Sequence, residues 1–137
     1  GVRVSPFNPF NDLEAGFPGE REDFLALVDE LARRGIAYLS LIATPGALPE
    51  GLVAEVRARF EGTLILAGDY DATRAETDLA AGLADLIAFG RPFVANPDLP
   101  ARLFAGKPLA QMDASKLYSP GPEGYTDYPA LRETAAA

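Results

Sequence analysis

The chain has 137 residues, 48% of them apolar, a formal net charge of −8, and neither cysteine nor histidine. This size and composition suit one globular domain, whereas the acidic charge argues against nucleic acid or a membrane surface as a partner, because binding phosphates requires a basic patch. Without histidine we expect neither Ser–His nor Cys–His catalysis in this chain and no metal site, and without cysteine we expect a reducing, cytoplasmic location.

The apolar pattern predicts strands and helices in strict alternation. We expect strands at residues 1–4, 36–42, 63–67 and 85–89, and helices at 20–34, 52–60, after Asp71, and after Asn96. A long polar connection, residues 5–19, follows the first strand. A β-α-β-α-β-α-β-α order suits parallel strands. The sequence opens inside the first strand, which suggests a truncation or an artificial boundary.

Spacing and capping residues predict which helix faces are buried. Asp71 is placed to cap the third helix, and Asn96 to cap the fourth, with Pro97 at its first helical position. The side chains expected to pack inward are Phe24, Leu27, Val28 and Leu31 in the first helix, Leu52, Val53, Val56 and Phe60 in the second, Ala75, Leu79 and Leu83 in the third, and Leu99, Leu103 and Phe104 in the fourth.

The periodic pattern ends near Gly106. The remaining segment is rich in proline and contains Tyr118, Tyr125 and Tyr128. It fits either an ordered extension or a mobile tail, and we expect Tyr125 and Tyr128 to hold it by burying their rings. We therefore divide the chain into a βα domain at residues 1–106 and a C-terminal extension at residues 107–137.

Glycine-bearing turns follow the last two predicted strands. Gly68 and Gly90 lack side chains that would obstruct an anion approaching the backbone N–H groups, and Arg91 adds a forked cation suited to phosphate oxygens. By themselves the glycines fit an ordinary turn equally well, and Arg91 also fits an ion pair with Asp69 or Asp98. The pattern predicts a phosphate-binding edge of a parallel sheet.

Four successive βα units make half of a (β/α)8 barrel, or TIM barrel. In that fold the phosphate site is commonly formed by the loops after the seventh and eighth strands. The glycine-bearing turns here follow the last two strands. This coincidence favours the C-terminal half of a barrel over a doubly wound sheet.

Four motifs carry a resemblance to a known family: GVRVSPF, AGDYDATRAE, DLIAFGRPFVANPDLPARL and EGYTDYP. In this order they resemble the C-terminal half of the Old Yellow Enzyme family of FMN-dependent ene-reductases. The resemblance implies an eight-stranded barrel with FMN at its C-terminal mouth and NAD(P)H as the reductant. It also implies hydride delivery to the activated C=C bond of an enal, enone, maleimide or nitroalkene.

The resemblance also implies roles for individual residues. Arg3 matches an arginine that lies along the flavin ring and favours its reduced, anionic form. Gly68 and Asp69 match a turn whose backbone holds the FMN phosphate, and Gly90 and Arg91 match the second phosphate-binding pair. None of these residues is catalytic in the sense of moving a proton.

The chain departs from the family pattern at several positions. Tyr118 matches a substrate-contacting tyrosine, but the glycines around it are changed, and packing of the extension is an equal alternative. Asp69 puts a carboxylate where the family has a small or neutral residue, which is unfavourable beside a phosphate. Ser40 and Ala43 stand where a family strand ends in histidine and then Glu-Pro.

The family's substrate-binding His/Asn or His/His pair and its proton-donating tyrosine belong to the N-terminal half. We therefore expect no catalytic residue in this chain and an N-terminal half of the same barrel as its partner. A non-catalytic half-barrel that binds flavin or phosphate and self-associates is the alternative, because both sheet edges would be open. A different phosphate-binding barrel enzyme is a third possibility, against which the EGYTDYP motif argues.

Overall fold

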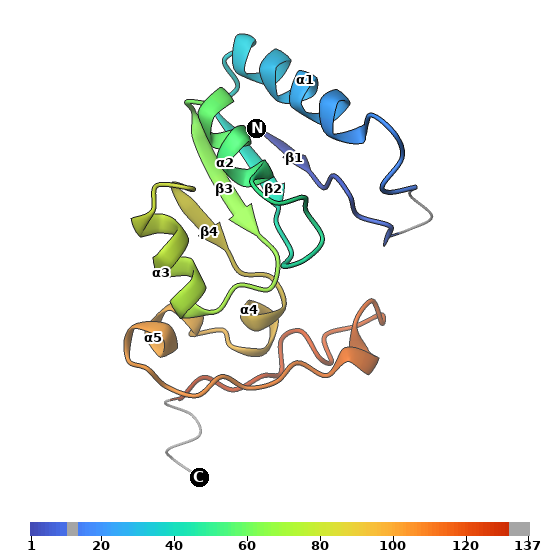
Figure 1. Cartoon of the computed structure of the whole chain (residues 1–137). Helices are drawn as coiled ribbons and strands as arrows, with labels where there is room; N and C mark the ends of the chain where they lie inside the picture. The colour runs from blue at the N-terminus through green and yellow to red at the C-terminus, as the bar shows by residue number, and fades with distance from the viewer. Residues whose placement is uncertain (11–13, 132–137) are drawn as a thin grey trace. The chain divides into compact units, whose positions relative to one another are not determined.

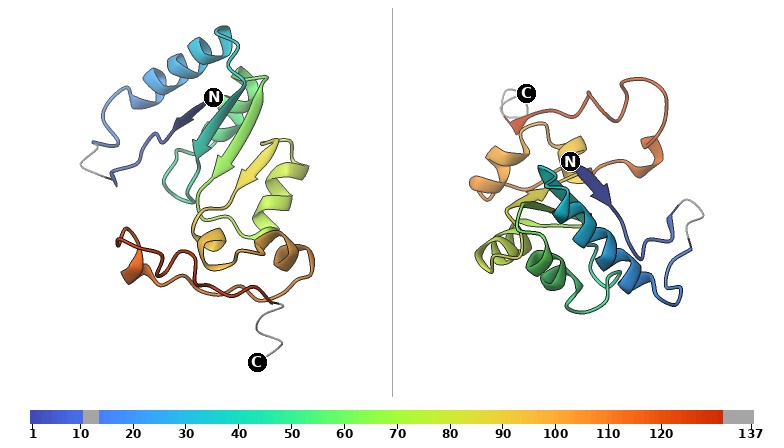
Figure 2. Two further views of the ribbon diagram at one scale, coloured as in Figure 1. Left: turned by 180° about the vertical axis from the view of Figure 1, so that it is seen from behind. Right: turned by 90° about the horizontal axis from the view of Figure 1, so that it is seen from above.

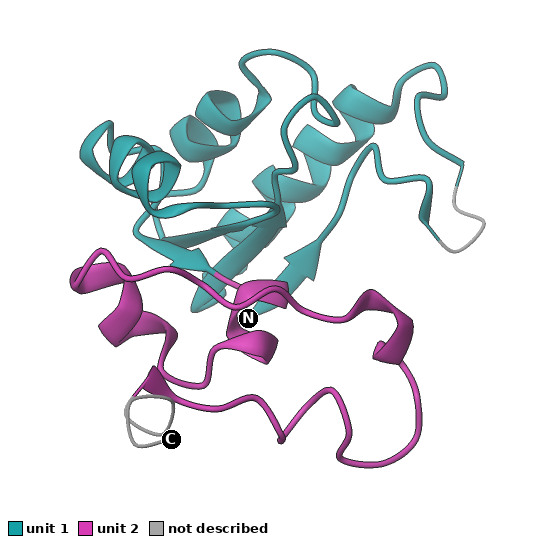
Figure 3. Ribbon diagram, turned by 90° about the horizontal axis from the view of Figure 1, so that it is seen from below, with its two compact units in different colours: residues 1–88 teal, residues 89–137 magenta. Residues whose placement is uncertain are grey.

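The computed structural model describes residues 1–10 and 14–131. The chain forms two compact units, Gly1–Ala88 and Phe89–Ala137 (Figure 3). The predicted boundary between a βα domain and an extension at residue 107 stays a prediction.

The first unit is built on a parallel sheet. Its strands are β1 (Val2–Val4), β2 (Tyr38–Ile42), β3 (Thr63–Ala67) and β4 (Leu86–Ala88), and they lie side by side in chain order (Figure 2). A doubly wound sheet reverses its strand order at a switch point, whereas a barrel keeps the order of the chain. The predicted alternation is therefore confirmed, and the topology is that of consecutive barrel units.

Helices cover one face of this sheet. They are α1 (Glu20–Arg33), α2 (Leu52–Arg59) and α3 (Ala72–Ala80) (Figures 1 and 3). The strand residues that alternate toward them are fully buried, namely Leu39, Leu41, Leu64 and Leu66. This core holds the strands in register, because a shift of one residue would turn these leucines to the opposite face.

No helix of the described part of the first unit covers the opposite face. The strand register places Arg3, Ser40, Ile65 and Leu86 in one row across that face. Leu86 is 53% exposed and Tyr38, on the same face, is 42% exposed. This face therefore carries exposed apolar side chains beside the polar Arg3 and Ser40.

Two expectations about the helices of this unit are wrong. Leu27 is 44% exposed, and Leu25 is buried in its place, because α1 turns a slightly different side to the sheet. Helix α3 ends at Ala80, before Leu83, since Gly82 takes a left-handed φ of 68°. The predicted cap is confirmed, with the Arg74 N–H donating to the Asp71 carboxylate at 2.8 Å.

The second unit contains α4 (Arg91–Ala95), α5 (Leu99–Phe104) and the 3-10 turn η2 (Ala114–Lys116). Helix α4 is not among the predicted elements. Helix α5 begins at Leu99, so Asn96 as its cap and Pro97 as its first residue are wrong. Phe104 is 93% exposed, whereas Arg102 is only 5% exposed. The buried side of α5 therefore carries a charge where a phenylalanine was expected.

The segment after α5 follows a defined path as far as Leu131. The Tyr125 hydroxyl accepts a hydrogen bond from the Tyr118 N–H at 2.7 Å, and the Tyr128 hydroxyl accepts one from the Asp113 N–H at 2.8 Å. Tyr125 is 37% exposed. The two tyrosines thus hold this segment through their hydroxyl groups, and the prediction that the Tyr125 ring is buried is wrong. Among the helices described, none is long and apolar enough to cross a membrane.

Candidate phosphate-binding site

The turn between β3 and α3, residues 68–71, has an unusual backbone. Gly68 has a φ of 118° and Asp69 a φ of 51°. A Cβ atom at Gly68 would lie 2.7 Å from the Thr44 nitrogen and 2.9 Å from its hydroxyl oxygen. Only glycine combines this positive φ with so close an approach to a neighbouring backbone. The turn therefore packs closely against Thr44 at the carboxyl end of the sheet.

Several contacts hold this turn against the end of β2. The Ala43 N–H donates to the Ala67 carbonyl at 2.6 Å. The Arg74 guanidinium donates to the Gly68 carbonyl at 2.8 Å and to the Ala43 carbonyl at 2.7 Å. Arg74 is not among the residues predicted for the site. Its spacing of four residues from Asp78, which suits a side-chain pair on a helix, is the sequence signal that could have identified it.

Tyr70 completes the support of the turn. Its ring is 5% exposed and lies under the guanidinium of Arg74, 3.9 Å from ring centre to Cζ. The Tyr70 hydroxyl donates to the Asp78 carboxylate at 2.7 Å. Burial and the Asp78 carboxylate raise the pKa of Tyr70 far above its ordinary value. Tyr70 is therefore a neutral hydrogen-bond donor at every physiological pH.

Gly90 and Arg91 follow β4 by two and three residues and belong to the second unit. Gly90 has a negative φ of −92°, and a Cβ there meets no atom within 4 Å. Its carbonyl accepts the Phe93 N–H at 2.9 Å and so begins α4, of which Arg91 is the first residue. The structure thus places Gly68 with Asp69 in one turn and Gly90 with Arg91 in another, each in its own unit.

The two remaining predicted residues belong to neither of these turns. Arg3 is exposed in the middle of β1, on the face of the sheet without helices, and pairs in register with Ser40. Tyr118, in the second unit, is 86% exposed and has a left-handed φ of 61°. The Tyr118 backbone is held by its N–H bond to the Tyr125 hydroxyl, while the Tyr118 ring is exposed to solvent.

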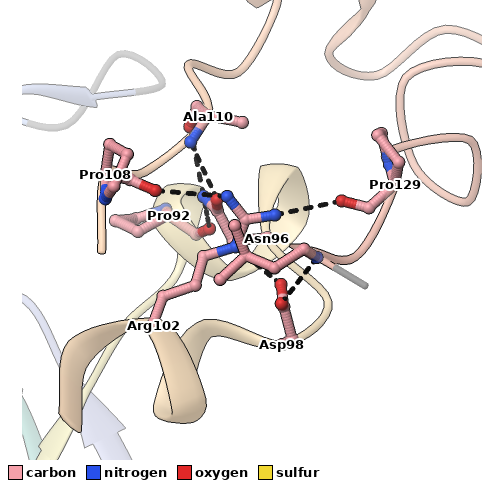
Figure 4. Close-up of polar contacts among 8 residues, drawn as sticks. Pro92, Asn96, Asp98, Arg102, Pro108, Ala110 and Pro129 are labelled. Atoms are coloured by element: carbon pink, nitrogen blue, oxygen red, sulfur yellow. Dashed lines mark hydrogen bonds and ion pairs between the residues drawn. The ribbon is translucent and has the colours of Figure 1, made fainter. Parts of the chain in front are cut away.

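Buried polar contacts support the segment that follows Arg91 (Figure 4). The Asn96 side chain, fully buried, donates to the Pro92 carbonyl at 2.8 Å and to the Ala110 carbonyl at 3.1 Å, and accepts the Ala110 N–H at 2.8 Å. These bonds satisfy the amide group and tie α4 to residue 110. Asn96 is therefore a structural residue of this unit rather than a helix cap.

Together, the chain-ordered parallel sheet and the helices on one of its faces define part of an α/β barrel, with the glycine turn at the carboxyl edge of the sheet. Within the residues described, no cluster of acidic side chains is arranged to hold a metal ion. Residues 1–110 match the model of the NADH:flavin oxidoreductase / NADH oxidase family. The chain belongs to this family, which is the Old Yellow Enzyme family.

Named relatives and solved structures support the assignment to this family. The chain is 38% identical to 12-oxophytodienoate reductase 1 of Oryza sativa subsp. japonica, over 97% of this chain and 37% of that protein. It is similar in structure to morphinone reductase, with a TM-score of 0.86 and 42% identity over 96% of this chain and 36% of that one. The old yellow enzyme homologue of Zymomonas mobilis gives 0.84 and 34% identity over 95% and 38%. The chain thus spans little more than a third of its relatives' length.

Proposed function

We propose that this chain forms the C-terminal half of an FMN-dependent ene-reductase barrel and holds the phosphate end of the cofactor. The observation that carries the proposal is the left-handed turn at Gly68 and Asp69, which lies at the carboxyl edge of the sheet before α3. A side chain at Gly68 would strike Thr44, so the glycine lets the turn pack against the end of β2. This geometry fits an FMN phosphate.

Each predicted residue then has a physical task. In the first unit, the backbone N–H groups of the Gly68 turn donate to phosphate oxygens. In the second unit, Gly90 and Arg91 take the role of the family's second phosphate-binding pair, to which Arg91 brings a permanent positive charge. Arg3 places a second positive charge beside the flavin ring, and Tyr118 contacts the substrate. When bound, FMN supplies hydride transfer from NAD(P)H to the activated C=C bond of an enal, enone, maleimide or nitroalkene. The protein's share of the chemistry is position and electrostatics.

An N-terminal half of the same barrel is the partner in this proposal. The uncovered face of the sheet, with Tyr38 and Leu86 exposed, is the side that would line the interior of a closed barrel. β1 and β4 are the sheet's edges, so each has one side open for another strand. The length of the relatives leaves room for the missing strands.

The same exposed face favours a second candidate, a non-catalytic half-barrel that self-associates. Two copies would cover each other's apolar face and edges, and flavin or phosphate binding would occur without turnover. A native mass spectrum of the protein separates the two. A second polypeptide and a mass matching FMN support the ene-reductase, whereas a homodimer of this chain supports the alternative.

Flavin binding tests the site itself. FMN and riboflavin differ only in the phosphate, so titration of flavin fluorescence with both measures phosphate recognition directly. We expect Arg91→Ala to weaken FMN binding and to leave riboflavin binding unchanged. The matched control is Arg59→Ala, which removes an exposed ion pair with Asp29 between α2 and α1. Equal loss for both flavins would contradict the proposed role of Arg91.

A further inference from the structure

We infer that Arg74 is a positioning residue for the cofactor phosphate: it sets the direction of the Gly68–Asp69 peptide from behind the turn. The inference rests on the proposed function and adds to it a residue that lies outside the two glycine turns. Arg74 lies in the first turn of α3, in the first unit together with the β3–α3 turn.

The guanidinium bonds two carbonyls that come from different strands. One Nη atom donates to Gly68, just after β3, and the other donates to Ala43, just after β2. Since Ala43 also donates its N–H to Ala67, these contacts join the ends of both strands to α3. A planar fork with two parallel donors is suited to this bridge, and a lysine ammonium is not.

The bond to the Gly68 carbonyl has a consequence for the next amide. All peptide bonds in the described chain are trans, so the Asp69 N–H points opposite to the Gly68 carbonyl. Because Arg74 holds that carbonyl, the Asp69 N–H points away from Arg74. A single side chain thus determines toward which side of the turn the Asp69 N–H points.

Arg74 is itself held in place. Its side chain is 29% exposed, it stacks on the Tyr70 ring, and its Nε lies 3.8 Å from the Asp78 carboxylate, which also accepts the Tyr70 hydroxyl. The backbone N–H of Arg74 donates to the Asp71 carboxylate at the start of α3. These contacts leave the guanidinium little freedom, so the turn is ordered before any ligand arrives, which lowers the entropy cost of binding.

The test compares Arg74→Ala and Arg74→Lys with the unchanged protein, in titrations with FMN and with riboflavin. We expect Arg74→Ala to weaken FMN binding about tenfold or more, because the Asp69 N–H would lose its charge-assisted hydrogen bond to the phosphate. Riboflavin binding should stay within about twofold of the unchanged protein. Arg74→Lys keeps the charge but loses the fork, so it should recover only part of the loss. Arg59→Ala, with the same change of charge elsewhere in the first unit, should change neither affinity.

Amide hydrogen exchange in the absence of flavin gives an independent readout. We expect faster exchange at Asp69 and Tyr70 in Arg74→Ala, and unchanged exchange in the strands. An Arg74→Ala protein that keeps both the slow exchange and the preference for FMN overturns the inference. Equal affinities of the unchanged protein for FMN and riboflavin would instead overturn the proposed function, so the two failures are distinguishable.

Discussion

Asp98 and Arg102 lie one turn apart in and before α5 and form an ion pair, with 2.7 Å between Asp98 Oδ1 and Arg102 Nε. The remaining guanidinium nitrogens donate to the Pro108 carbonyl at 3.2 Å and the Pro129 carbonyl at 3.1 Å. The other oxygen of Asp98 accepts the Leu131 N–H at 2.9 Å. This pair therefore holds both ends of the segment that follows α5 (Figure 4).

Replacing Arg102 by methionine should loosen that segment. The change keeps most of the buried volume but leaves the carbonyls of Pro108 and Pro129 without their donors, which costs about 1–3 kcal/mol of unfolding free energy. Chemical denaturation measures the cost, and chymotrypsin cleavage after Tyr118 or Tyr125 reports the loosening. Arg59→Met, which breaks an exposed pair, is the control and should change both little. Unchanged cleavage in Arg102→Met would show that the segment is held by other contacts.

Stability should fall in acid through Asp98. The Leu131 N–H and the Arg102 guanidinium hold the pKa of the Asp98 carboxyl below its ordinary value. A carboxyl whose pKa is lower in the folded state stabilises the protein above its unfolded pKa of about 4, and this contribution is lost as the pH falls through the folded pKa. We expect the difference in melting temperature between the wild type and Asp98→Asn to shrink from pH 6 to pH 2.5. A difference independent of pH contradicts the assignment.

Gly68→Ala should damage both folding and flavin binding. The new methyl group would lie 2.7 Å from the Thr44 nitrogen, and the alanine would have to adopt a positive φ of 118°. We expect the unfolding free energy to fall by about 1–3 kcal/mol. We also expect the affinity for FMN to fall more than the affinity for riboflavin.

Gly46→Ala is the matched control for this change. Gly46 also has a positive φ, of 75°, but a Cβ there has open space around it. The difference between the two variants isolates the close approach to Thr44. If both variants lose the same stability and keep FMN binding, the close approach of Gly68 to Thr44 is unimportant.

Arg3→Ala separates a role at the flavin from a role in folding. Arg3 is exposed on β1, so its loss should change unfolding free energy by less than about 0.5 kcal/mol. In the flavin-loaded protein we expect the flavin midpoint potential to become more negative, because a positive charge that stabilises the reduced flavin is removed. Spectroelectrochemical titration measures the shift. An unchanged potential would remove Arg3 from the cofactor site.

The local signals in the sequence predicted the first unit well. The β3 span, residues 63–67, is confirmed at both ends, and the Asp71 cap of α3 is confirmed, because each depends on residues close together in the chain. The errors have long-range causes. Arg102, and not the predicted Phe104, lies on the buried side of α5 because it bonds the carbonyls of Pro108 and Pro129. Those residues belong to a segment whose sequence has no periodic pattern. Asn96 does not cap α5 because its side chain bonds Ala110.

By itself the sequence determined the alternation of strands and helices, the family, and the presence of glycine at both turns, since each is encoded in short runs of neighbouring residues. Only the tertiary structure decided why Gly68 must be glycine and what Arg74 does. Both answers depend on the end of β2, where Ala43 and Thr44 lie more than twenty residues away in the chain but in contact with the turn. Hydrogen bonds and close packing between strands depend on distance in space, and no local pattern records that distance.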